Sequence, residues 1–159
     1  MHSDEHGPDT HGELPVDPDE RPLHLRVHAL AWVFAGGLIG TGVRYWAAET
    51  FPSAEGHWPW ATFAVNIIGA FVLGALLELL ARLGHDEGWR QRVRLFGGTG
   101  ICGALTTYST FALEISELTR ASAVTTALAY AAVSVVLGLL AAASGIALAS
   151  AIVTRWARR

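Results

Sequence analysis

Hydroxyl side chains are concentrated in one short stretch of the chain. Five consecutive residues, from Thr106 to Thr110, each carry a hydroxyl group, and Gly103 precedes them. Glycine and β-branched threonine are poor helix formers, so this stretch predicts a break in a helix. A break inside a membrane leaves carbonyl oxygens that protein, water or a hard cation must satisfy. The alternative is an unbroken helix whose hydroxyls bond to carbonyls four residues earlier.

Two further polar side chains stand in apolar surroundings. Asn66 must find a hydrogen-bond partner there, so it either bonds to another helix or donates an N–H group to a passing solute. Taken alone, it favours the bond between helices. Arg44 follows a glycine-rich stretch, and a charge in an apolar span usually faces water or a partner. Arg44 either extends to the membrane interface or forms a positive vestibule that attracts anions.

Hydroxyl and small residues also follow a regular spacing between positions 130 and 138. Tyr130, Ser134 and Gly138 are spaced at four-residue intervals, so they share one face of a helix. A single hydroxyl in a membrane span is usually bonded locally. Together with Ser109 and Thr110, however, this face could supply hydroxyl donors from two helices.

Four long apolar stretches must position these groups. Of the 159 residues, 52% are hydrophobic and 16% are charged, which is typical of a membrane protein. A membrane-spanning helix needs about 20 apolar residues. We therefore predict an all-α integral membrane protein whose four transmembrane helices cover residues 27–48, 60–81, 93–118 and 121–154, with the break in the third.

The remaining residues predict a tail and an orientation. Residues 1–22 are acidic, rich in histidine and without apolar periodicity, so we expect a disordered tail before a four-helix transmembrane domain over residues 23–159. Nine arginines flank one side of the predicted spans and only Arg120 flanks the other. This bias predicts a multi-pass protein of the cell membrane with both termini in the cytoplasm. The sequence shows no basic surface of the kind that binds nucleic acid.

Three motifs together resemble the Fluc (CrcB) family of bacterial fluoride channels. The first is a glycine-rich helix that ends in Arg-Tyr, here Gly36 to Tyr45. The second is a central asparagine followed by glycine, here Asn66 and Gly69. The third and most specific is the stretch from Gly100 to Phe111, similar to the family signature G-x-C-G-G-L-T-T-F-S-T-F.

The resemblance implies a passive fluoride channel, not an enzyme, built as an antiparallel dimer with two pores. It also implies a structural Na⁺ at the dimer interface, held by the backbone carbonyls of Gly103 and Thr106. The residues that would bind fluoride or line its pore are Arg44, Asn66, Tyr108, Ser109, Thr110, Phe111, Tyr130 and Ser134. Two positions depart from the signature, because Ala104 replaces a glycine and Tyr108 replaces a phenylalanine.

Alternatives remain at this point. A small multidrug-resistance-type cation/proton antiporter would also be a four-helix antiparallel dimer, but it needs a carboxylate within the first helix, and Glu49 lies only at its exit. The strong arginine bias opposes insertion in both orientations. The partner in the dimer is therefore either a second copy of this chain or a related subunit of opposite orientation.

Overall fold

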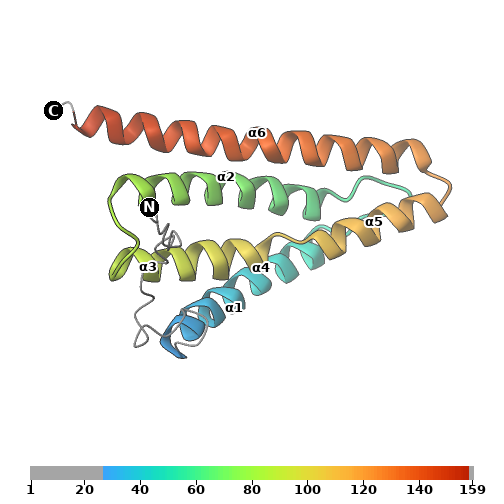
Figure 1. The fold of residues 1–159 in the computed structure, drawn as a ribbon. Helices are drawn as coiled ribbons and strands as arrows, with labels where there is room; N and C mark the ends of the chain where they lie inside the picture. The colour runs from blue at the N-terminus through green and yellow to red at the C-terminus, as the bar shows by residue number, and fades with distance from the viewer. Residues whose placement is uncertain (1–26, 158–159) are drawn as a thin grey trace, which may run out of the picture.

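A computed structural model describes residues 27–157, and every regular element in that range is helical. The elements are α1 (Val27–Thr50), α2 (Trp60–Arg82), α3 (Trp89–Val93), a π-helical segment η2 (Arg94–Cys102), α4 (Gly103–Leu105), α5 (Tyr108–Arg120) and α6 (Val124–Ala157) (Figure 1). The predicted tail over residues 1–22 lies outside the described residues.

Three of these helices are long and apolar enough to cross a membrane, namely α1, α2 and α6. They cover the first, second and fourth predicted spans. Many of their large apolar side chains are exposed, including Phe34 on α1 and Leu128 and Leu139 on α6. Exposure of such large apolar surfaces to water is unfavourable, whereas contact with lipid or with another protein chain is not. The arrangement indicates a multi-pass membrane protein.

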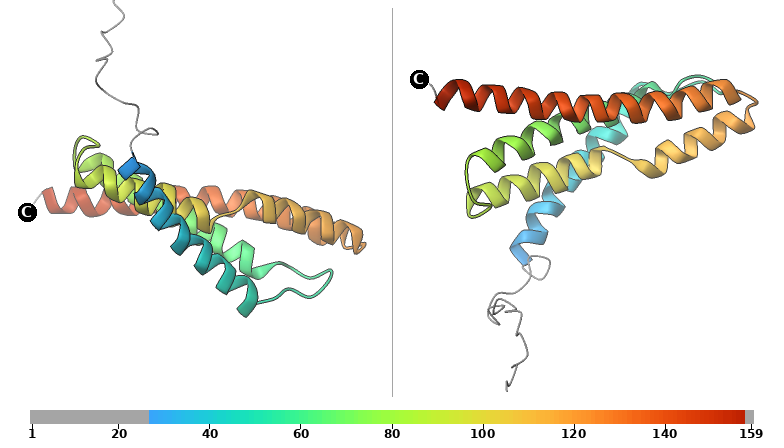
Figure 2. Two further views of the ribbon diagram at one scale, coloured as in Figure 1. Left: turned by 90° about the horizontal axis from the view of Figure 1, so that it is seen from below. Right: turned by 45° about the horizontal axis from the view of Figure 1, so that its top comes forward.

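The third predicted span is divided among shorter segments. Helix α4 ends at Leu105, Thr106 and Thr107 have extended backbone, and α5 begins at Tyr108. Figures 1 and 2 show the chain crossing between α4 and α5 as a thin connection before it continues in α5. The connection is formed by Thr106 and Thr107, the threonine run, whose β-branched side chains favour extended backbone.

Glycines allow the helix backbones to approach closely. A Cβ atom at Gly36 on α1 would overlap the carbonyl oxygen of Phe96 on η2, and one at Gly145 on α6 would overlap the carbonyl of Phe71 on α2. Close backbone approach replaces the hydrophobic driving force that is missing between helices in lipid. Two tightly packed pairs of helices result, α1 with η2 and α2 with α6.

Gly36→Ala is expected to destabilise the protein, whereas Gly37→Ala is not. The two glycines are neighbours in α1, so alanine improves helix propensity equally at both, by about 1 kcal/mol. Only Gly36 lacks space for the added methyl group, since nothing described lies within 4 Å of a Cβ at Gly37. Overpacking should make Gly36→Ala about 2 kcal/mol less stable than the control, as measured by unfolding in detergent. Equal unfolding midpoints would contradict the close packing.

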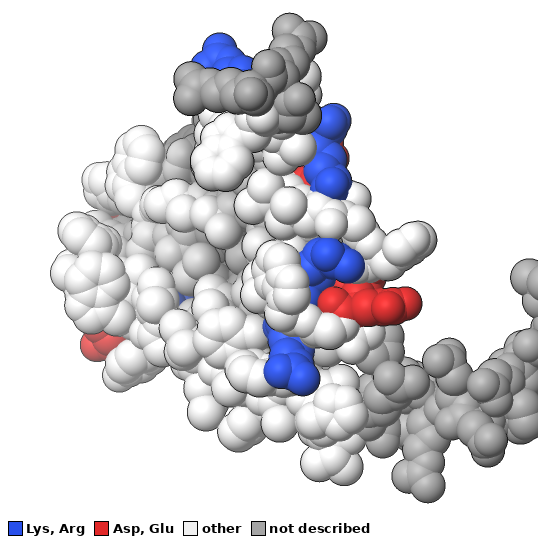
Figure 3. Space-filling model, turned by 90° about the vertical axis from the view of Figure 1, so that its left-hand side faces the viewer, with Lys and Arg blue, Asp and Glu red and all other residues white. Residues whose placement is uncertain are grey.

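Basic side chains gather at the end of the molecule that contains the α2–α3 turn (Figure 3). Three are held by local contacts: Arg82 pairs with Glu78, Arg94 pairs with Asp86, and Arg90 donates to the carbonyls of Leu83 and His85 at 3.0 and 2.6 Å. The other described arginines of this end are Arg92 and Arg155, and both are exposed. The direction of this end in the membrane stays a prediction.

Candidate functional site

The side chain of Asn66 is bonded to the backbone of the extended connection. Its Oδ1 accepts a hydrogen bond from the N–H of Thr107 at 2.8 Å, and its Nδ2 donates to the carbonyl of Thr107 at 3.3 Å. Asn66 on α2 thus provides hydrogen-bond partners for both the N–H and the carbonyl of Thr107. One N–H of the Asn66 amide is not used by these two bonds.

Side-chain oxygens replace two backbone carbonyls as hydrogen-bond acceptors at the connection. In a continuous helix the N–H of Thr107 would bond to the carbonyl of Gly103, but it bonds to Asn66 instead. The N–H of Thr110 would likewise bond to the carbonyl of Thr106, but it donates to Thr107 Oγ1 at 3.1 Å. Side chains have therefore replaced Gly103 and Thr106 as the acceptors for these two N–H groups, and both carbonyls are available to other donors or to a cation.

The hydroxyls after the connection form a compact cluster around Thr107, whose side chain is buried. Thr107 Oγ1 lies 3.0 Å from Thr110 Oγ1 and 3.1 Å from Ser109 Oγ. Thr107 is also the N-cap of α5, because its oxygen accepts from the N–H three residues later. The capping bond explains why α5 can begin abruptly after two extended residues.

A carboxylate that the sequence analysis missed joins three helices beside this cluster. Glu114 on α5 accepts hydrogen bonds from Thr62 Oγ1 on α2 at 2.5 Å and from the hydroxyl of Tyr130 on α6 at 2.6 Å. Tyr130 has no solvent exposure and packs against Trp58 and Phe111. The only sequence signal was an acidic residue within the predicted third span.

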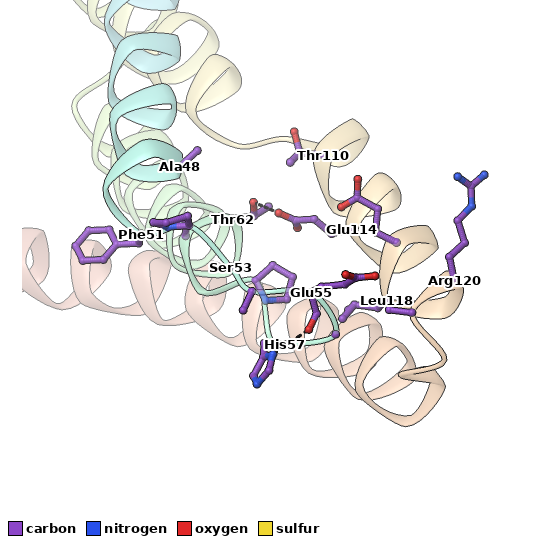
Figure 4. A pocket seen from close by; sticks show the side chains of 17 residues that line it. Ala48, Phe51, Ser53, Glu55, His57, Thr62, Thr110, Glu114, Leu118 and Arg120 are labelled. Carbon is purple, nitrogen blue, oxygen red and sulfur yellow. Dashed lines mark hydrogen bonds between the residues drawn. The ribbon is translucent and has the colours of Figure 1, made fainter.

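Two cavities adjoin these groups. The larger, of about 610 Å³, is lined by the α1–α2 connection, the N-terminal part of α2, and α5, and it contains Glu114 (Figure 4). The smaller, of about 230 Å³, is lined by Arg44 and Thr41 on α1. Ala48, Ala61, Thr62 and Thr110 line both cavities. The two spaces are therefore neighbours, and Thr62 and Thr110 lie on the boundary between them.

Comparison with known proteins identifies the family. Residues 31–146 match the family described as CrcB-like protein, Camphor Resistance (CrcB). This chain belongs to that family. It is 46% identical to "Fluoride-specific ion channel FluC 2" of Leifsonia xyli subsp. xyli over 82% of this chain and 90% of the relative. It is 41% identical to "Fluoride-specific ion channel FluC 1" of Cutibacterium acnes over 78% of this chain and 83% of the relative.

A third relative is similar over most of its own length. "Fluoride-specific ion channel FluC" of Ignicoccus hospitalis is 41% identical over 74% of this chain and 91% of the relative. All the predicted site residues lie within the part of this CrcB-like chain that matches the family, whereas residues 1–22 lie outside it.

The remaining predicted residues of this CrcB-like chain differ in their surroundings. Tyr108 is 81% exposed, and its ring centroid lies 6.3 Å from that of Phe111. Phe111 in turn packs on Tyr130 with ring centroids 5.2 Å apart. The oxygen of Ser134 is buried and has no hydrogen-bond partner among the described residues. The structure therefore does not gather the eight predicted residues in one cavity of a single chain. It brings Asn66 close to the hydroxyl cluster, and it places Arg44 and Thr110 on one cavity.

Proposed function

We propose that this chain forms a passive, fluoride-selective ion channel that lowers cytoplasmic fluoride. The observation that carries the proposal is that relatives with 41–46% identity over most of the chain are named fluoride-specific ion channels. The antiporter alternative has no such support. It would need a carboxylate within the first helix, and Glu49 stands only at the end of α1.

The chemistry of the described site suits a small, strongly hydrated anion. Fluoride must exchange its water shell for good hydrogen-bond donors, and Arg44 supplies a permanent positive charge at the smaller cavity. The unused N–H of Asn66 and the unpartnered hydroxyl of Ser134 are suitable donors. We assign the ion pathway to Arg44, Asn66, Tyr108, Thr110, Phe111, Tyr130 and Ser134, with Ser109 beside it in the hydroxyl cluster.

The fluoride-channel family also implies a structural Na⁺, and the residues present fit it. Sodium is a hard cation that prefers oxygen ligands, and the carbonyls of Gly103 and Thr106 have lost their helical donors to Asn66 and Thr107. We propose that these two carbonyls hold the ion. Its positive charge would offset the electrostatic cost of an anion nearby in a medium of low dielectric constant.

A second subunit would complete the pathway. Tyr108 adjoins the carbonyls of Gly103 and Thr106 in the sequence, yet its ring lies on the surface of the single chain. An antiparallel dimer would cover this surface and add a second pair of carbonyls to the cation site. The partner is either a second copy of this chain or a related subunit of opposite orientation, both in the cell membrane.

Liposomes that contain only this purified chain are expected to release fluoride far faster than chloride. The larger chloride ion would not fit a narrow pore lined by aromatic rings. Fluoride and chloride electrodes would record efflux after the membrane potential is clamped with valinomycin and potassium. Equal rates for the two anions would contradict the selectivity. Fluoride efflux from this chain alone would also show that it pairs with itself.

A further inference from the structure

Thr107 has one hydroxyl hydrogen and three hydrogen-bond neighbours. The N–H of Thr110 donates to Thr107 Oγ1 at 3.1 Å, so this contact uses a lone pair. Thr107 Oγ1 in turn donates to Thr110 Oγ1 at 3.0 Å, and this bond uses its only hydrogen. The third neighbour, Ser109 Oγ at 3.1 Å, must then donate its own hydrogen to Thr107.

These bonds give the two neighbouring hydroxyls opposite roles. The hydrogen of Ser109 is directed at Thr107, so Ser109 offers only lone pairs to anything outside the cluster. Thr110 accepts from Thr107 and keeps its own hydrogen for another partner. Thr110 also lines both described cavities, whereas Ser109 lines neither of them.

We propose that Thr107 is a positioning residue that directs the hydroxyl hydrogen of Thr110 toward the ion pathway, so that Thr110, and not Ser109, donates to fluoride. The inference rests on the proposed function. Thr107 itself is only 8% exposed and acts through its neighbour. Without it, the Thr110 hydroxyl loses the bond that fixes its oxygen, and its hydrogen is no longer held in one direction.

The test compares fluoride efflux from liposomes for four single variants. Thr107→Val preserves the shape of the side chain but removes its hydroxyl. It should lower efflux about tenfold, like Thr110→Val, because hydrogen bonds to charged groups are stronger than those between neutral groups. Thr107→Ser restores the hydroxyl and should recover most of the rate. Ser109→Ala should stay within about twofold of the unmodified protein, because its hydrogen does not face the ion.

A double variant separates positioning from general damage. If Thr107 acts only through Thr110, then Thr107→Val should lower efflux no further in a Thr110→Val background. An equal loss in both backgrounds, or Ser109→Ala as damaging as Thr110→Val, would overturn the inference. If Thr107→Val does not elute from a sizing column as a single folded species, the comparison of Ser109→Ala with Thr110→Val still tests which hydroxyl donates to fluoride. Absence of fluoride efflux from the unmodified protein would instead reject the proposed function.

Discussion

Asn66→Asp is expected to lower fluoride efflux by about 100-fold or more, because it introduces a negative charge where the anion should pass. Two unit charges about 4 Å apart repel by about 4 kcal/mol at an effective dielectric constant of 20. The substitution also replaces the Nδ2 donor with an oxygen, which would face the carbonyl of Thr107 now 3.3 Å away. The extended connection would lose one of its two bonds to α2, while the bond from the N–H of Thr107 could persist.

The chain offers a matched control for this variant. Gln91→Glu is the same change from amide to carboxylate, and Gln91 lies on the short helix α3, far along the chain from the threonine run and close to the arginines. It should leave efflux nearly unchanged. Efflux is measured by a fluoride electrode, with elution from a sizing column as the check on folding. A folded Asn66→Asp protein that conducts normally would restrict Asn66 to a packing role.

Much of the fold could be predicted from the sequence because apolar runs of membrane length leave few alternatives. The helices α1, α2 and α6 begin within three residues of the expected spans and end within three residues of them. The threonine run indicated an irregular backbone, since its residues oppose helix formation locally. What the sequence could not predict is which distant group satisfies that backbone. Asn66 and Thr107 are 41 positions apart, and only the packing of α2 on the connection brings them together.

The surroundings of the hydroxyl residues were harder to foresee. The spacing of Tyr130 and Ser134 defines a helix face, but it does not say what that face meets. In the structure the hydroxyl of Tyr130 donates to Glu114, so its hydrogen is already used. In the sequence, Glu114 is followed by Glu117 and Arg120, a pattern that resembles the polar end of a span. Its two partners lie on α2 and α6, and no local pattern reveals them.

Glu114→Ala is expected to lower the free energy of unfolding by about 3 kcal/mol, because it leaves two hydroxyl groups without their acceptor. Tyr130 is fully buried, so water cannot replace the lost partner of its hydroxyl. Thr62 loses its acceptor as well, and α5 loses its side-chain bonds to both α2 and α6. The measurement is reversible unfolding of the purified protein in detergent micelles.

Glu117→Ala is the matched control, since Glu117 lies on the same helix and the same cavity but is exposed. It should change the unfolding free energy by less than about 0.5 kcal/mol, as is usual for surface positions. The effects should also be non-additive: when Tyr130→Phe and Thr62→Val have already removed both donors, Glu114→Ala should have a much smaller effect. If Glu114→Ala remained equally damaging in that background, its role would lie outside these two hydrogen bonds. If it were no more damaging than Glu117→Ala, the bonds would contribute nothing to holding α2, α5 and α6 together.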